Sequence, residues 1–320
     1  MKNKIFKIII TIFLYLIISG VSNSNEFNFD ITEVEITENG NKFSGYNRGE
    51  IKTQDGVIIN ADQFEYIKNL GILNASGKVE ILDTINNFSI YTDKITYKKK
   101  EEIIFTENGS RAINLNDDVT IDANEFVFNR NLNILIAKKK VVIEDKIQNY
   151  KIYSDFIEYR KNKERIFSKG KTSAVIDKKY NFKSEDVLLL RNSKELNSKK
   201  KTSITSTVNL YILSNFNYSI GKEILKGEDI IISTNFNLPK NDKFYFKSGI
   251  IDLSTKNFVA KDTKIEIHKD IFDNTENDPR LKGVSSNKTG DITVVNKGVF
   301  TSCKKNDSCP PWAIQAKEIK

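Results

Sequence analysis

A repeat of 31 residues constrains the fold of this chain more than any other feature. Residues 61–66, 92–97, 123–128 and 154–159 share one pattern: a small residue, then Asp or Asn, with apolar or aromatic residues two and four positions after that. The Asp or Asn stands at positions 62, 93, 124 and 155, so the spacing is 31 residues each time. A fifth copy at 184–189 follows after 30 residues. Repeats of this length are typical of stacked architectures.

The apolar residues within each copy alternate with period two, which predicts β-strands. In the first copy Val57, Ile59 and Ala61 are odd-numbered, whereas Phe64 and Tyr66 are even-numbered. The alternation slips at the same place in every copy. In a flat strand such a slip would turn the second half to solvent, whereas a bulge or corner keeps both halves facing one interior. Each repeat is therefore expected to bend at its Asp or Asn.

One repeat accommodates a long bent strand, a turn and a return strand, so five copies predict about ten strands joined by hairpins. No stretch of the sequence combines helical periodicity with capping residues. The predicted fold is all-β: an elongated, twisted β-jellyroll of stacked, bent antiparallel strands around an apolar interior. A β-solenoid scaffold with a closed core is the alternative.

The inward-facing positions are expected to line a continuous apolar groove between the two layers. Small residues at positions 75, 106, 137 and 168 would leave width along this groove. Such a groove suits acyl chains, because each buried methylene contributes ~0.8 kcal/mol. The predicted lining residues are Ile59, Phe64, Tyr66, Ile90, Ile95, Tyr97, Ile121, Phe126, Phe128, Ile152, Ile157 and Tyr159.

The N-terminus has the pattern of a cleaved secretory signal peptide, with Lys2, Lys4 and Lys7 before an apolar run and small residues after it. An uncleaved membrane anchor is the alternative, and both place the rest of the chain outside the cytoplasm. Polar, lysine-rich residues 197–206 are expected to form a long loop. The expected organisation is a signal peptide at 1–24, a jellyroll domain at 25–296 with regular repeats at 57–196 and a degenerate continuation at 207–296, and a cysteine-containing linker at 297–320.

The charge of the chain favours an anionic partner. Cleavage after residue 24 would remove three lysines and no acids, which lowers the formal net charge from +8 to +5. This mild excess suits a phosphorylated lipid. Basic residues are not clustered with stacking aromatics, so a nucleic-acid partner is not expected.

The sequence has no constellation typical of an enzyme. The one histidine, His268, stands at an apparent strand end without a partner motif, and no Gly-rich phosphate loop or activated nucleophile is found. The recurring Asp62, Asp93, Asn124 and Asp155 are expected to satisfy backbone donors at a bend rather than to bind calcium. We therefore expect a non-catalytic protein without cofactor or metal.

The repeated unit resembles the OstA-like domain that is shared by the lipopolysaccharide-transport proteins LptA, LptC and LptD. Residues 277–283 (NDPRLKG) resemble a motif of LptD, and residues 297–303 and 309–316 resemble the loop and cysteine-containing stretch that precede its barrel. The resemblance implies a periplasmic domain, associated with the outer membrane, that binds and conducts lipopolysaccharide through the acyl chains of lipid A. An LptA- or LptC-like bridge component is the alternative.

The resemblance also implies partners. An LptA-like protein would add a strand to the N-terminal sheet edge, near residues 27–60. LptD proteins continue into an outer-membrane barrel, which binds an LptE-like lipoprotein, so this chain is expected to be a fragment or to lack the barrel. Cys303 and Cys309 are six residues apart and are expected to form a short disulfide loop in an oxidising compartment. The resemblance also allows a pairing with barrel cysteines instead.

Overall fold

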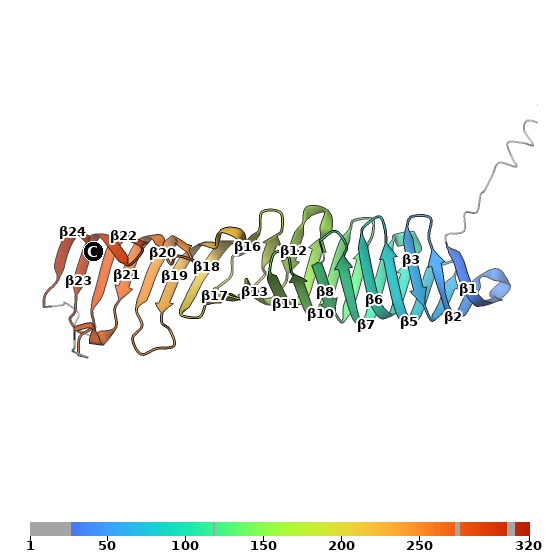
Figure 1. Ribbon diagram of the computed structural model, residues 1–320, viewed down its shortest axis with the longest axis horizontal. Helices are drawn as coiled ribbons and strands as arrows, with labels where there is room; N and C mark the ends of the chain where they lie inside the picture. The colour runs from blue at the N-terminus through green and yellow to red at the C-terminus, as the bar shows by residue number, and fades with distance from the viewer. Residues whose placement is uncertain (1–26, 118, 273–275, 306–310) are drawn as a thin grey trace, which may run out of the picture.

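The computed structural model describes residues 27–117, 119–272, 276–305 and 311–320, so the predicted signal peptide and Cys309 lie outside the described residues. Within these residues, 24 strands form one continuous antiparallel sheet. Bent strands that follow one another in the chain lie side by side, from β1 (Asn28–Thr37) at one end of an elongated molecule to β24 (Ile314–Ile319) at the other (Figure 1). The predicted all-β jellyroll is confirmed.

Most of the long strands run through the bend without a break, whereas five are split there into two shorter ones. The unbroken strands between β1 and β24 are β2 (Lys42–Lys52), β5 (Ile72–Asp83), β6 (Phe88–Lys98), β7 (Ile103–Asn114), β10 (Ile134–Asp145), β11 (Tyr150–Arg160), β18 (Asn209–Ser219), β19 (Ile224–Thr234), β20 (Lys243–Asp252), β21 (Phe258–Glu266), β22 (Arg280–Thr289) and β23 (Ile292–Thr301). The split strands are β3 (Val57–Ala61) with β4 (Gln63–Ile67), β8 (Val119–Ala123) with β9 (Glu125–Asn129), β12 (Arg165–Ser168) with β13 (Lys171–Ile176), β14 (Tyr180–Glu185) with β15 (Leu188–Leu190), and β16 (Glu195–Ser198) with β17 (Thr202–Thr205). The helical elements are short 3-10 turns at Glu38–Gly40, Lys99–Glu101, Lys161–Lys163, Ile220–Lys222 and Lys269–Phe272.

The bend lies where the slip in alternation predicts it. Asp62 stands alone between β3 and β4, and its N–H donates to the carbonyl of Gly77 on β5 at 2.9 Å. Gly77 and Lys78 have φ of 79° and 47°, and the pairing of β5 with β6 places these two residues opposite Asp93. Two residues facing one is a β-bulge, which bends the strands so that both halves face one interior.

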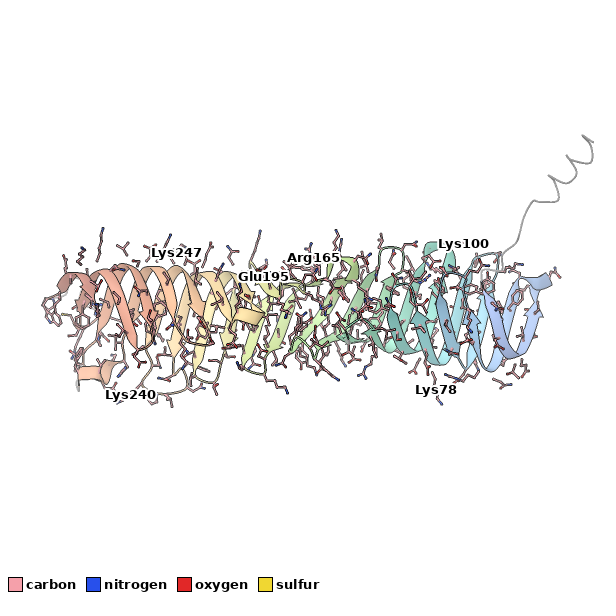
Figure 2. The ribbon with its side chains drawn as sticks, turned by 45° about the horizontal axis from the view of Figure 1, so that its top comes forward. Lys78, Lys100, Arg165, Glu195, Lys240 and Lys247 are labelled. Atoms are coloured by element: carbon pink, nitrogen blue, oxygen red, sulfur yellow. The ribbon has the colours of Figure 1, made fainter. Side chains whose placement is uncertain are left out.

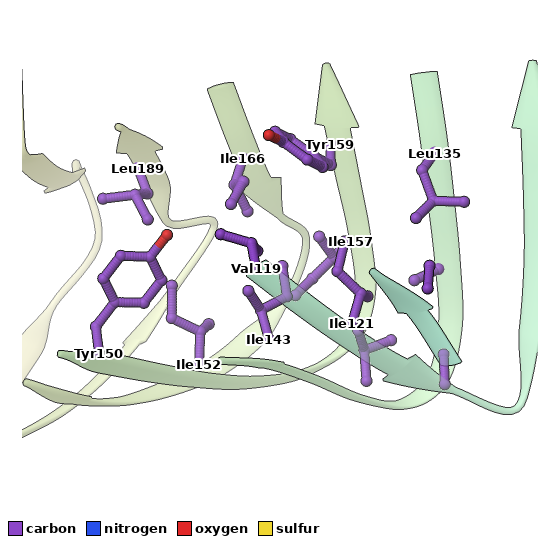
Figure 3. Packing of buried hydrophobic residues seen from close by; sticks show 14 of the residues in the cluster. Val119, Ile121, Leu135, Ile143, Tyr150, Ile152, Ile157, Tyr159, Ile166 and Leu189 are labelled. Atoms are coloured by element: carbon purple, nitrogen blue, oxygen red, sulfur yellow. The ribbon is translucent and has the colours of Figure 1, made fainter. Parts of the chain in front are cut away.

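The interior is filled by alternation of large and small side chains from strand to strand. Along one row of paired residues, Phe64 is followed by Ala75, Ile95, Thr106, Phe126, Ala137, Ile157 and Ser168. The two halves of each bent strand belong to two facing layers. Buried side chains from both layers fill the space between them (Figure 3). The small residues thus accommodate their large neighbours, which is how a close-packed interior is built.

The regular stack continues where the sequence predicts a loop. Residues 197–206 include the end of β16 and all of β17, so the loop prediction is wrong. Thr202 and Ile204 point inward and are 1% and 0% exposed, and the lysines at 199–201 lie at the bend between the two strands. The alternation there is only four residues long, and the lysine run conceals it.

The stack also runs on through the degenerate part of the sequence. One core cluster of buried residues extends from Phe27 to Ala260, and a smaller cluster contains Ile265, Leu281 and Val295. The residues expected to form a linker, 297–320, include the last residues of β23 and all of β24, which pairs with β23. The domain boundaries themselves stay predictions.

Candidate functional site

The twelve predicted lining residues all lie in the interior between the two layers. Each of them is between 0% and 5% exposed. Figure 3 shows Ile121, Ile152, Ile157 and Tyr159 among them, with their side chains directed into the space between the strands. Charged side chains such as Lys78, Lys100 and Arg165 project from the outer surface along the length of the molecule (Figure 2). The interior is therefore a continuous apolar core, and an acyl chain would bind there only if the layers part.

The layers meet along one side of the molecule, opposite the bends, in two rows of turns. We call the line between these rows the seam. One row consists of the turns at 53–56, 84–87, 115–117, 146–149 and 177–179, and the other of those at 68–71, 99–102, 130–133, 161–164 and 191–194. Any opening of the interior along its length has to separate these two rows.

An arginine bridges the seam at its N-terminal part. The guanidinium of Arg130, which is 6% exposed, donates from Nε to Asp83 Oδ2 at 2.7 Å and from Nη1 to Asp55 Oδ2 at 2.8 Å. The same Nη1 contacts the Tyr97 hydroxyl at 2.9 Å and pairs with Glu102. Asp55 and Asp83 belong to one row of turns, and Arg130 and Glu102 belong to the other. These residues, with Lys99, form what we call the Arg130 cluster.

The Arg130 cluster shifts the pKa values of Asp55 and Tyr97 in opposite directions. Burial would raise the pKa of Asp55, but hydrogen bonds from Lys99, the Thr53 hydroxyl and Arg130 hold that pKa well below its ordinary value. Burial raises the pKa of the Tyr97 hydroxyl well above its usual range, so it stays protonated. A buried charge is tolerated only when paired and hydrogen-bonded, and this network meets that condition at neutral pH.

A second cluster of the same construction lies two repeats further on. The guanidinium of Arg191, 3% exposed, donates from Nη2 to Asp145 Oδ2 at 2.9 Å and to Asp117 Oδ2 at 2.7 Å, and Nη1 pairs with Glu164. It also donates to the hydroxyls of Tyr150 and Tyr159, at 3.1 Å each. The three carboxylates and Tyr159 stand 62 residues after their counterparts in the Arg130 cluster. We call this set the Arg191 cluster.

Lys161 joins the two clusters. Its ammonium, buried in the seam, donates to the backbone carbonyls of Asn86 and Asn87 in the opposite row, the latter at 3.1 Å. Burial lowers the pKa of Lys161. From Lys99 to Arg191 the seam is thus closed by successive polar contacts between the rows.

Sequence reasoning missed these cations although the repeat contains their signal. Lys99, Arg130 and Lys161 stand six residues after the Asp or Asn of their copies, and Arg191 stands six residues after Glu185, which occupies that position in the fifth copy. A buried row of cations at one repeat position predicts a row of acceptors facing it. Which acceptors these are depends on the packing of the two layers, because Asp83 and Arg130 are 47 residues apart.

Beyond the Arg191 cluster the seam changes in character. Glu223 accepts hydrogen bonds from Lys179 Nζ at 2.9 Å and from the Tyr180 hydroxyl at 2.8 Å. The Lys179–Glu223 contact is the last ion pair across the seam within the described residues. A pocket of about 300 Å³ follows between the turns at 206–208 and 253–257. We call it the seam pocket; its lining is Val208, Asn209, Tyr211, Ile232, Thr234, Asn235, Asp242, Phe244, Ile251, Lys256, Phe258 and Lys288.

The remaining candidate residues lie apart from the interior. Nδ1 of His268 is 2.9 Å from Asp242 Oδ1, at the rim of the seam pocket. The predicted Cys303–Cys309 disulfide stays untested, because Cys309 is outside the described residues; Cys303 is partly exposed. The Asp62 carboxylate pairs with Arg48 at 3.1 Å. Within the described residues no group of three or more His, Cys, Asp or Glu side chains is arranged to hold a metal ion.

Hollows also occur on the outer face of the bend, away from the interior. One of about 870 Å³ is bordered by charged side chains that include Lys78, Asp93, Arg111 and Asp122. Arg111 and Asp122 form an ion pair across it at 2.7 Å. Because it lies on the outer face among charged side chains, the hollow is a poor candidate for a lipid site that continues into the interior.

Fold and site together define a class: an elongated antiparallel β-jellyroll with an apolar interior that is closed along one side by buried ion pairs. A scan against known protein families finds no match, and neither does a search of curated protein sequences. Among solved structures the chain is similar to LptH, described as the LptA-homologous periplasmic component of the lipopolysaccharide transport device from Pseudomonas aeruginosa. That similarity has a TM-score of 0.34 and 10% identity, and it covers 38% of this chain and 94% of LptH. None of the helical segments within the described residues is long and apolar enough to cross a membrane.

Proposed function

We propose that this chain is a non-catalytic periplasmic component of lipopolysaccharide transport to the outer membrane, which binds the acyl chains of lipid A between its two layers. One observation carries the proposal: a single apolar core runs without interruption from Phe27 to Ala260 along the stack. Neighbouring stretches of this core are nearly alike, because the repeat places the same kinds of side chain in each. A chain bound in one stretch therefore has a site of similar free energy beside it, and it can move along without local chemistry.

The length of the core distinguishes it from that of an ordinary small sandwich. A stack that serves only as a support needs buried apolar area, but its strands do not have to be long and bent around one uninterrupted interior. Each methylene that enters such an interior contributes ~0.8 kcal/mol, so several acyl chains would be bound tightly. The sugar and phosphate groups of the lipid would stay in water at the seam.

A scaffold with a closed core is the second candidate function. The observation that favours it is the burial of the lining residues, since Ile59, Tyr97, Phe128, Ile157 and Tyr159 are 0% exposed. The two candidates differ in one physical respect, which is whether the layers part at the seam to admit a ligand.

The more specific assignment to an LptD-type domain rests on the motifs at 277–283, 297–303 and 309–316. Under that assignment the N-terminal edge strand β1 receives an LptA-like bridge protein, and an outer-membrane barrel with its LptE-like lipoprotein acts after the jellyroll. An LptA- or LptC-like bridge component would use both sheet edges instead. β1 suits strand addition because Val34 and Ile36 are 43% and 58% exposed on a strand that, within the described residues, pairs with β2 alone.

Photo-crosslinking tests the proposal directly. A photoreactive amino acid at position 95 or 126, which faces the interior, is expected to form an adduct with lipopolysaccharide in cells. The matched control is position 91, where Tyr91 is 44% exposed on the outer face of β6, the strand that carries position 95. A second outer position is 153 on β11, where Tyr153 is 39% exposed. Equal labelling at inner and outer positions, or none at the inner ones, would refute lipid binding in the interior and favour the closed scaffold.

The edge assignment has its own test. A photoreactive residue at position 34 or 36 on β1 is expected to crosslink to an LptA-like protein, whereas one at position 317 on β24 is not. Crosslinks from β24 alone would reverse the proposed orientation. Crosslinks from both edges would favour a bridge component over an LptD-type domain.

A further inference from the structure

One position recurs at the beginning of successive turns along the seam, and its side chain changes in character along the molecule. At each of these positions the backbone N–H donates to a carbonyl in the preceding turn of the same row, for example Arg130 to Glu102 at 3.0 Å and Leu253 to Glu223 at 2.9 Å. The first five positions carry cations and the last two carry apolar side chains. In chain order the positions are Lys68, Lys99, Arg130, Lys161, Arg191, Ile220 and Leu253.

Leu253 therefore occupies the place that Arg130 and Arg191 occupy in their clusters. The tyrosine and the glutamate of the cluster are still present beside it: Tyr218 and Glu223 correspond to Tyr97 with Glu102 and to Tyr159 with Glu164. The Tyr218 hydroxyl is buried and has no hydrogen-bond partner in the described part of the chain. In the two clusters the equivalent hydroxyls are bonded to arginine. The arrangement at Leu253 is thus a cluster without its arginine, in which Lys179 of the opposite row pairs with Glu223 instead.

The seam pocket lies beside this arginine-free position. Ile251, on its wall, belongs to the same row of paired residues as Leu225 and Tyr218. Its apolar surface comes from Tyr211, Ile232, Phe244, Ile251 and Phe258, which belong to both layers. A volume of about 300 Å³ has room for roughly ten groups of the size of a water molecule, which matches one alkyl chain of moderate length.

The rim of the pocket carries positive charge. Lys256 and Lys288 line it, and neither forms an ion pair with a described residue. The one carboxylate on the rim, Asp242, is engaged by His268, whose backbone N–H and ring Nδ1 both lie 2.9 Å from its Oδ1. A pocket whose lining is half apolar and which carries two lysines at its mouth is complementary to an alkyl chain that ends in an anionic group.

Building on the proposed function, we propose that the seam pocket binds one alkyl chain of an anionic amphiphile, and that it is the place where such a chain enters the interior from the side. Along the seam from Lys99 to Arg191, parting the layers would break several buried ion pairs at once and leave charges such as Asp83 and Asp145 without partners. At the seam pocket no ion pair between described residues holds the layers together. Chains therefore enter past Lys256 and Lys288, and the two arginine clusters oppose entry from the side between Lys99 and Arg191.

Restoring the missing arginine tests this inference. The probe is dodecyl phosphate below its micelle concentration, titrated calorimetrically into the chain from residue 25 onward. Wild type is expected to bind one equivalent, and Leu253→Arg is expected to bind at least tenfold more weakly. The introduced guanidinium would reach Tyr218 and Glu223 and close the seam. An affinity of Leu253→Arg within twofold of wild type, or no binding by wild type, overturns the proposal.

Two further variants keep the test decisive. If Leu253→Arg does not fold, Ile232→Trp fills the pocket from its floor and is expected to give the same loss of binding; unchanged binding by this variant overturns the proposal. Lys256→Gln with Lys288→Gln is expected to weaken dodecyl phosphate at least fivefold while changing dodecanol less than twofold. Lys226→Gln, an exposed lysine on β19 away from the pocket, is the matched control and is expected to bind like wild type.

Competition distinguishes the sources of the amphiphile. Displacement of dodecyl phosphate by lipid A supports the pocket as a site for lipopolysaccharide, and displacement only by lysophosphatidylglycerol supports it as a phospholipid site. Displacement by neither contradicts the proposal. The outcome is separable from the proposed function: lipopolysaccharide adducts at positions 95 and 126 test the interior, whereas Leu253→Arg tests only the place of entry.

Discussion

Replacing Arg130 by leucine, the residue that the chain itself uses at the equivalent position 253, measures how strongly the seam is closed. The substitution removes two ion pairs to Asp83 and Asp55 and one to Glu102, and it leaves the Asp83 carboxylate, 1% exposed, without its cation. Removing one partner of a buried ion pair costs about 3–5 kcal/mol. We expect Arg130→Leu to lower the free energy of opening this part of the stack by that amount.

Arg48→Leu is the matched control for this experiment. Arg48 also bridges two carboxylates, Asp62 and Glu80, but its side chain is 44% exposed. Exposed pairs contribute about 0–1 kcal/mol, so this variant is expected to stay close to wild type. The contrast mainly tests burial, because both changes remove an arginine that pairs with more than one carboxylate.

Hydrogen exchange resolved by residue is the appropriate assay, because a long stack of repeats opens locally rather than as one unit. Amides of β5 through β10 are expected to exchange faster in Arg130→Leu, while those of β18 through β23 keep their wild-type rates. Adding Asp83→Asn is expected to recover at least about 1 kcal/mol, since it removes the orphaned charge. The reasoning is refuted if Arg130→Leu and Arg48→Leu are equally mild, or if exchange accelerates uniformly along the stack.

Three other predictions concern packing, backbone and pH. Ala137→Phe is expected to lower stability by about 1–3 kcal/mol in thermal unfolding, because Phe126 and Ile157 on the flanking strands fill the space beside it. Gly77→Ala is expected to lower the free energy of unfolding more than Gly109→Ala. Both glycines have positive φ, but a Cβ at Gly77 would lie 2.7 Å from Asp62 Oδ2, whereas one at Gly109 meets nothing within 4 Å. Equal losses of stability would contradict this. Folding lowers the pKa of Asp55, so the stability that Asp55 contributes is present above the unfolded pKa of about 3.9 and is lost as the pH falls below that value. Urea unfolding of the wild type between pH 7 and pH 3 should show this loss of stability, and Asp55→Asn should show a smaller loss.

Sequence reasoning predicts the bends and the interior because both depend on relations within one strand. The slip between Ala61 and Phe64 requires a bulge wherever the strand keeps both halves buried, and the twelve predicted lining residues are buried accordingly. The left-handed residues opposite the bend are less accessible to such reasoning. Asn108 and Gly109 are typical of that conformation, but Lys78, Lys139 and Lys140 adopt it too, with φ of 47°, 63° and 55°, because the bulge imposes it on whichever residue stands there.

The seam and its pocket could not be predicted from periodicity for a different reason. Contacts across the seam join turns of different layers, and Asp55 is 75 residues from Arg130. The twist and spacing of the layers determine which turns face one another, and neither is encoded in the alternation of a single strand. That Leu253 stands where the two clusters have arginine can be recognised only once Leu253, Arg130 and Arg191 are known to be structurally equivalent.

The regular order of cations along the seam restricts how such a chain can change in length. Lysine and arginine alternate from one copy to the next, at Lys99, Arg130, Lys161 and Arg191, and the two arginine clusters are two copies apart. Deletion or duplication of a single copy would place a lysine where three carboxylates and a tyrosine are arranged for a planar guanidinium, and an ammonium does not reproduce that geometry. Loss or gain of two copies removes or adds one cluster and leaves each remaining cluster complete. Viable descendants of this protein should therefore differ in length by steps of about 62 residues rather than 31.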